Sequence, residues 1–142
     1  MLLSKGSKYA LRAAIHLAQH MGEPQLSRDI AQALGIPAQY LAKVLQDLAR
    51  HGILRSMKGR GGGFQLALPP ERLDLMTIVR AMEGEHFGEG CALGLPQCSA
   101  EDPCPLHDQW EHIRAGFMGM LERTRLVDLP SADSPGQREL TG

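Results

Sequence analysis

The chain has 142 residues, of which 43% are hydrophobic and 22% charged, and its formal net charge is −1. This length and composition suit one folded domain with an appendage. They exclude a membrane-spanning protein, because no apolar run approaches the ~20 residues of a transmembrane helix. The N-terminus lacks the long apolar stretch of a signal peptide, so we expect a cytoplasmic protein without membrane contacts.

Charge is unevenly distributed along the chain. Residues 1–66 contain nine Lys or Arg and three Asp or Glu, a net charge of +6. Residues 67–142 contain six and thirteen, a net charge of −7. The basic half suits a polyanionic partner such as DNA, although a chance split on a solvated surface would give the same counts.

Three helices are predicted in the basic half. Ser4 is expected to cap the first helix, and Ser27 a short second helix that ends at Gly35. The third helix runs to about Arg50. A short helix, a turn containing glycine and a longer helix with a polar face form the helix-turn-helix pattern, with an ordinary αα-hairpin as the alternative. The residues predicted to meet DNA from these two helices are Ser27, Gln39, Tyr40, Lys43 and Arg50.

Two short strands, about Ile53–Met57 and Phe64–Leu68, are predicted around the sequence KGRGGG. The glycines permit the positive φ that a tight hairpin tip needs. A basic hairpin directly after a helix-turn-helix is typical of a wing, whose Lys58 and Arg60 would reach phosphates or the minor groove, with Arg55 on the approach. Glycine-rich loops also bind nucleotide phosphates, but no Gly-Lys-Ser/Thr follows here.

The predicted fold class is mainly α with a small β-hairpin: a winged helix-turn-helix domain plus a long C-terminal dimerisation helix. The predicted divisions are a DNA-binding domain at 1–70, a connecting helix within 71–89, a cysteine loop at 90–107, the dimerisation helix at 105–127 and a disordered tail at 128–142.

Apolar residues of the long helix repeat at spacings of three and four, which is typical of a helix that pairs with another helix. Gly116 and Gly119 each cost roughly 1 kcal/mol relative to Ala in an exposed helix, which makes sense if another helix approaches closely. A second copy would give a symmetric homodimer; packing on its own domain is the alternative. The predicted interface residues are Trp110, Ile113, Phe117, Met120 and Thr124.

All three cysteines, Cys91, Cys98 and Cys104, lie on one turn-rich loop with His107 just after it. Clustered thiols in a reducing compartment more often bind metal or sense redox than form disulfides. Structural zinc sites pair their ligands closely, whereas looser spacing favours an iron–sulfur cluster. Cys104 is expected at the N-cap of the long helix, where the dipole favours a thiolate. A zinc site, and a redox switch formed by the thiols without metal, are the alternatives.

The chain contains the stretches SKGSKYALRA, PAQYLAKVLQDLARHGIL and MKGRGGGFQLA, and its three cysteines lead into CPLHDQW. With these stretches, the chain resembles the Rrf2 family of bacterial winged-helix regulators. The resemblance covers roughly residues 1–127. It implies a homodimer with two winged helices and, where the cysteines are present, an iron–sulfur cluster.

The resemblance implies that Cys91, Cys98 and Cys104 are cluster ligands and that His107 is the fourth, as in the 2Fe–2S branch. Some relatives take an acidic ligand from the first helix, but no Asp or Glu precedes Glu23 in this chain. The gap between the first two cysteines is one residue longer than in that branch. A 2Fe–2S cluster is therefore favoured, and a 4Fe–4S cluster stays open.

The predicted function is a transcription regulator, a repressor, that binds a pseudo-palindromic site on double-stranded DNA. Its DNA affinity would be controlled by a cluster that senses redox, iron or nitric oxide. A thiol- or zinc-responsive regulator without iron is the nearer alternative. A small iron–sulfur electron carrier is a further one, but it has no use for a polar helix face and a basic wing. No catalytic constellation is visible, so no enzyme activity is expected.

Overall fold

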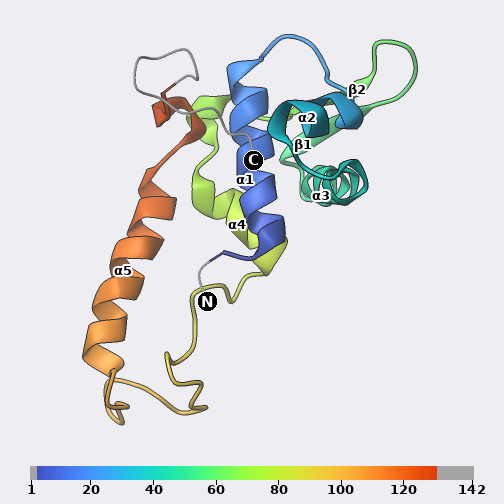
Figure 1. Ribbon diagram of the computed structural model, residues 1–142. Helices are drawn as coiled ribbons and strands as arrows, with labels where there is room; N and C mark the ends of the chain where they lie inside the picture. Colours follow the sequence, from blue (N-terminus) through green and yellow to red (C-terminus); the bar gives the residue numbers. More distant parts are fainter. Residues whose placement is uncertain (1–2, 131–142) are drawn as a thin grey trace.

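The computed structural model describes residues 3–130, which form a helical domain with one β-hairpin and a long helix that extends from it (Figure 1). The elements of the described chain are α1 (Lys5–Gln19), α2 (Ser27–Leu34), α3 (Ala38–Arg50), β1 (Leu54–Met57), β2 (Gly63–Leu66), a 3₁₀ turn (Pro70–Arg72), α4 (Leu75–Glu83), α5 (His107–Arg123) and a second 3₁₀ turn (Leu126–Asp128). No helix within these residues is both long and apolar enough to cross a membrane.

Helix α1 lies at the centre of the domain and contacts α2, α3 and α4. It begins as predicted, because the Ser4 hydroxyl accepts the N–H of Ser7 at 3.1 Å. Its buried face consists largely of alanines, which let the neighbouring helices approach closely. The buried residues of this face are Gly6, Ser7, Ala10, Ala13, Ala14 and Leu17.

Helices α2 and α3 form the predicted helix-turn-helix. Gly35 adopts the left-handed conformation (φ 67°) that ends α2, as the sequence indicated. The predicted cap at Ser27 was wrong: Leu26 occupies the N-cap position, and Ser27 is the first helical residue. The reason is non-local, since Gln25 is held in an extended pairing with β2 and the helix starts as soon as that pairing ends.

The hairpin is antiparallel, with Leu54 opposite Leu66 and Met57 opposite Gly63. Gln25 joins its base as a third segment: its N–H donates to the carbonyl of Phe64 at 2.9 Å, and its carbonyl accepts the N–H of Phe64 at 2.7 Å. A Cβ on Gly63 would lie 2.3 Å from the Gln25 carbonyl oxygen, so this close approach requires glycine. The hairpin is therefore fixed at its base, while its tip projects from the domain (Figure 1).

Helix α4 is capped by Asp74, whose Oδ1 accepts the N–H of Thr77 at 2.7 Å, and it packs against both α1 and α5. The C-terminal end of α5 is tied to the start of α4. The Leu75 N–H donates to the Thr124 carbonyl at 2.9 Å, and the Leu126 N–H donates to the Leu73 carbonyl at 2.8 Å. The other end of α5 extends away from the domain and carries the cysteine loop (Figure 1).

The long helix is shorter than the predicted 105–127. It begins at His107 and ends at Arg123, because Thr124 turns into extended backbone to pair with the chain before α4. Thr124 therefore does not continue the helical stripe. Of the tail predicted to be disordered, residues 131–142 lie outside the described residues, and Asp128 closes the second 3₁₀ turn.

Candidate metal centre and nucleic-acid interface

The three cysteines converge at the far end of α5. Their Sγ atoms all lie within 4.8 Å of one another, and those of Cys91 and Cys104 are 3.5 Å apart. The Nδ1 of His107 lies 3.2 Å from the Sγ of Cys98. Cys104 is buried, while Cys91 and Cys98 are half-buried. The four ligands predicted from the sequence are thus brought together, three of them as one compact group of thiols.

Turns in the loop bring the thiols together. Gly90 (φ 106°) and Gly94 (φ 75°) bracket the first cysteine, and the Gly94 N–H donates to the Cys91 carbonyl at 3.0 Å. A further turn links the Cys104 carbonyl to the His107 N–H at 3.0 Å. Cys104 therefore lies ahead of α5 rather than at its N-cap, which is Leu106. The expected position of Cys104 was wrong because this extra turn separates it from the helix.

The thiols differ in acidity. Backbone N–H groups of Leu95 and Leu93 point at Cys91 and lower the pKa of its thiol to about 7. Burial raises the pKa of the Cys104 thiol, opposite to the helix-dipole effect expected from the sequence. Metal binding requires thiolates, and three thiolates this close need a compensating cation. The donor set therefore fits a metal ion or an iron–sulfur cluster.

Helix α5 also holds the chain that leads into the first cysteine. The indole Nε1 of Trp110 donates to the Gly90 carbonyl, and Nη1 of Arg114 donates to the Gly88 carbonyl, each at 3.3 Å. Arg114 is itself held by both carboxylate oxygens of Glu111, at 3.1 and 2.8 Å. This pair lowers the pKa of Glu111, chiefly through the hydrogen bond from Arg114.

The predicted dimer stripe divides into two faces. Trp110 and Phe117 are half-buried against their own chain, and Phe117 lies 6.2 Å from Phe87 between ring centroids. On another face, large apolar side chains recur every seven residues and stay exposed in the described chain, and Gly116 has open space beside it. This exposed row consists of Leu106 (41%) at the N-cap and of Ile113 (58%) and Met120 (48%) within α5. Val127 (44%) is also exposed, but it lies in the second 3₁₀ turn, beyond the end of the helix.

The residues predicted to meet DNA lie on α3 and the hairpin. Gln39, Lys43 and Arg50 are exposed along one side of α3, and Lys58 and Arg60 are exposed at the hairpin tip. Arg55 is also exposed, on β1, and Ser27 is half-buried at the start of α2. The helix face and the hairpin tip thus both present basic side chains to solvent.

Two of these residues have partners within the chain. The Tyr40 ring packs edge-on against Tyr9 of α1, with centroids 5.3 Å apart, so it connects α3 to α1. The guanidinium of Arg50 forms an ion pair with Asp47 on the same helix. The pairing of Arg50 was not evident from the sequence pattern, although the i,i+3 spacing of the two residues is a signal that could have shown it.

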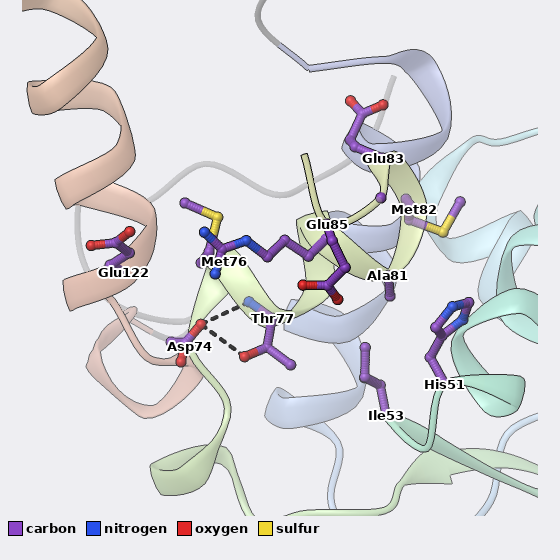
Figure 2. Close-up of a pocket in the computed structure, with 12 residues that line it drawn as sticks. His51, Ile53, Asp74, Met76, Thr77, Ala81, Met82, Glu83, Glu85 and Glu122 are labelled. Atoms are coloured by element: carbon purple, nitrogen blue, oxygen red, sulfur yellow. Dashed lines mark hydrogen bonds between the residues drawn. The ribbon is translucent and has the colours of Figure 1, made fainter. Parts of the chain in front are cut away.

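A separate cavity of about 710 Å³ lies between the segment that joins α3 to β1, helix α4 and the C-terminal part of α5 (Figure 2). Its charged lining is mostly acidic and includes Asp74, Glu83, Glu85 and Glu122, with Arg80 as the basic exception. Asp74 and Glu83 already accept backbone N–H groups, from Thr77 and Ser4. This lining would repel phosphates, and it contains none of the residues predicted to bind DNA or metal.

A family model described as "Rrf2: Iron-dependent Transcriptional regulator" matches residues 3–132, nearly the whole chain. The chain belongs to the Rrf2 family. This Rrf2 protein is 30% identical over 140 residues to the HTH-type transcriptional repressor NsrR of Streptomyces coelicolor. The aligned region covers 93% of this chain and 90% of NsrR.

Solved structures agree with this assignment. CymR, the global cysteine regulator of B. subtilis, is similar with a TM-score of 0.74 and 28% identity, over 90% of this chain and 95% of that one. IscR of T. potens is similar with a TM-score of 0.71 and 26% identity, over 90% and 85%. The winged-helix fold and the family resemblance expected from the sequence are therefore confirmed, and the family is one of transcriptional regulators rather than enzymes.

Proposed function

We propose that this Rrf2 regulator is a repressor whose DNA affinity depends on an iron–sulfur cluster held by Cys91, Cys98, Cys104 and His107. The observation that carries the proposal is the group of three thiols within 4.8 Å, with a histidine nitrogen beside one of them. Thiolates and imidazole are the donors that hold such clusters. When bound, the cluster would supply a redox-active centre that responds to iron supply, oxidants or nitric oxide.

The distances do not by themselves select iron. Thiolates on one tetrahedral zinc ion lie about 3.8 Å apart, given Zn–S bonds of about 2.3 Å, and the Cys91–Cys104 separation of 3.5 Å is close to that value. The family description as iron-dependent and the similarity to NsrR and IscR favour iron. A 2Fe–2S cluster is the favoured form, and a 4Fe–4S cluster is the second.

The DNA contacts follow from the exposed basic groups. Helix α3 would enter the major groove with Gln39, Tyr40, Lys43 and Arg50 near the bases or phosphates. Lys58 and Arg60 at the wing tip would contact the backbone or minor groove, with Arg55 nearer the wing base and Ser27 at the start of α2. Two such winged-helix domains, one from each chain of a dimer and about 34 Å apart, would require a pseudo-palindromic site.

A homodimer would supply the second winged-helix domain. The exposed row of Leu106, Ile113 and Met120 gives α5 a short apolar seam with a seven-residue repeat, the pattern by which two helices pair. Because the ligand loop is joined to the first residue of the same helix, occupation of the metal site and the geometry of the dimer would be coupled. Such couplings are typically of order 1–3 kcal/mol.

A regulator that senses through thiols alone is the second candidate. It is favoured by the 3.5 Å separation of the Cys91 and Cys104 sulfurs and by the similarity to CymR, a cysteine regulator. Here Cys91 and Cys104 would form a disulfide under oxidising conditions, with the two thiol protons and two electrons passing to the oxidant. Cys98 would not be needed.

The substitution Cys98→Ser separates the two candidates, because it removes one cluster ligand and leaves the Cys91–Cys104 pair intact. The matched control is Ala100→Ser, an exposed position of the same loop two residues after Cys98. Each protein is purified anaerobically, iron and sulfide are measured, and DNA affinity is compared before and after iron removal.

We expect iron and an iron-dependent affinity in the wild type and the control, and neither in Cys98→Ser. A wild-type chain that carries zinc, or no metal at all, would overturn the cluster proposal. An oxidant response that survives in Cys98→Ser would favour the thiol mechanism instead.

A further inference from the structure

The segment that leads into Cys91 lies along α5 in antiparallel order. Phe87 contacts Phe117, Gly88 lies beside Met118 and Arg114, and Gly90 meets Trp110. Further along, Cys98 reaches His107 at the start of the helix. Successive residues of the loop therefore contact successively earlier positions of α5.

Two of these contacts hold the backbone itself. The carbonyls of Gly88 and Gly90 each accept a hydrogen bond from an α5 side chain, Arg114 and Trp110 respectively. A side chain at position 88 is disfavoured by the positive φ of 88°, and a Cβ there would also displace the end of the Met118 side chain, 2.5 Å away. The segment is thus held close to the helix by specific groups, and Cys91 is the next residue after the last hydrogen-bonded carbonyl.

The side chains that make these bonds are themselves fixed. Glu111 holds the Arg114 guanidinium with two hydrogen bonds, so the third, to Gly88, comes from an oriented group. Glu111 is also four residues after His107, on the same side of the helix. The face of α5 that meets the loop is consequently a polar row formed by His107, Glu111 and Arg114, flanked by Trp110.

We propose that Trp110 and Arg114 are positioning residues for the metal site, acting as a clamp that holds Cys91 against α5. This inference rests on the proposed function for its consequence, since the clamp matters most if Cys91 is a ligand. Trp110 then serves its own chain rather than the dimer seam. Any displacement of Cys91 is passed to α5 through the clamp, near the exposed row that would meet the second copy.

The test removes each hydrogen bond with little change of shape. Trp110→Phe keeps an aromatic ring without the indole N–H, and Arg114→Met keeps a long unbranched side chain without any N–H donor. The control is Arg123→Met near the other end of the same helix, where the guanidinium lies over Gly119.

The first measurement is hydrogen–deuterium exchange of residues 85–91 in the iron-free full-length chain. Loss of one hydrogen bond should speed exchange of this segment about fivefold, the factor that corresponds to a typical net contribution. Exchange in α1 and α3 should not change, which shows that the variants are folded. Exchange equal to the wild type in both variants would overturn the clamp.

The second measurement is the rate at which the iron-loaded chains lose iron to a chelator. We expect faster loss from both variants and no change in Arg123→Met. Faster exchange with unchanged iron loss would overturn the link between the clamp and the site. A wild-type chain that never binds iron would contradict the proposed function, while the exchange experiment would still decide whether the clamp exists.

Discussion

The imidazole Nδ1 of His107 lies 3.2 Å from the sulfur of Cys98, although nine residues separate them in the chain. His107 is the first residue of α5, and Cys98 belongs to the irregular loop. Whatever binds both groups therefore ties the loop to the end of the helix. The same helix is anchored to the winged-helix domain at its other end, through Thr124 and Leu126.

The substitution His107→Ala should weaken iron binding. Mutation of a residue that only hydrogen-bonds to a metal ligand typically lowers metal affinity at least about tenfold. Removal of a direct ligand should therefore lower iron affinity by at least that factor. Iron content and the visible absorption of anaerobically purified protein measure this effect. His112→Ala, an exposed histidine on the same helix, is the control. Iron content and spectrum equal to the wild type would show that His107 is not a ligand.

The double substitution Lys58→Ala and Arg60→Ala should weaken binding to all DNA sequences alike. Each phosphate contact that is lost should flatten the slope of log affinity against log salt by about 0.9, so the loss of both contacts should change it by about 1.8. Fluorescence anisotropy at several salt concentrations, on specific and unrelated duplexes, gives both quantities. Arg72→Ala removes a basic side chain from the 3₁₀ turn before α4 and serves as the control. Affinity within about twofold of the wild type would remove the wing from the DNA interface.

The substitutions Ile113→Glu and Met120→Glu should convert a dimer into monomers. Both side chains are exposed in the single chain, at 58% and 48%, so the charges are tolerated there and become costly only when a second helix covers them. Sedimentation velocity reports the change in mass. Met21→Glu places a charge on an exposed apolar residue between α1 and α2, outside the row and outside the cysteine loop, and is the control. If the wild type is itself a monomer, the exposed row is not the dimer seam.

The helix-turn-helix was predictable because its signals are local. Gly35 marks the left-handed end of α2, and the apolar spacing of α3 matches the side chains that the fold buries. The start of α2 was not predictable, because it depends on the pairing of Gln25 with Phe64, which is far along the sequence. The three cysteines became metal-site candidates through their spacing on one turn-rich loop, and the family resemblance implied His107 as the fourth.

The sequence could not reveal which side of α5 packs against the cysteine loop and which side stays exposed. A spacing of three and four residues defines a stripe but does not say what covers it. Hydrogen bonds from Trp110 and Arg114 to two glycine carbonyls turn one face toward the loop. That leaves Ile113 and Met120 as the exposed remainder. Backbone carbonyls are present at every residue, so no sequence pattern marks the ones that a side chain will contact.

The stability of the domain should fall on mild acidification because of His16. Burial lowers the pKa of this imidazole, with the nearby His20 acting in the same direction and a hydrogen bond to Gln25 opposing both. The unfolded chain therefore binds the proton more readily than the folded chain. Stability that is present above the ordinary histidine pKa, near 6.5, is lost as the pH falls from that value through the lower folded pKa.

The measurement is the thermal unfolding midpoint of the iron-free protein between about pH 7.5 and about pH 5.5, the range in which histidines change charge. His16→Gln removes the titrating group while keeping a polar side chain that reaches Gln25, whose Oε1 now lies 2.9 Å from the His16 Nε2. We expect the wild type to lose more stability than His16→Gln over this range, so the difference between the two curves changes with pH. His112→Gln, at an exposed position, should follow the wild type. Parallel curves for wild type and His16→Gln would mean that His16 titrates alike in the folded and unfolded chains.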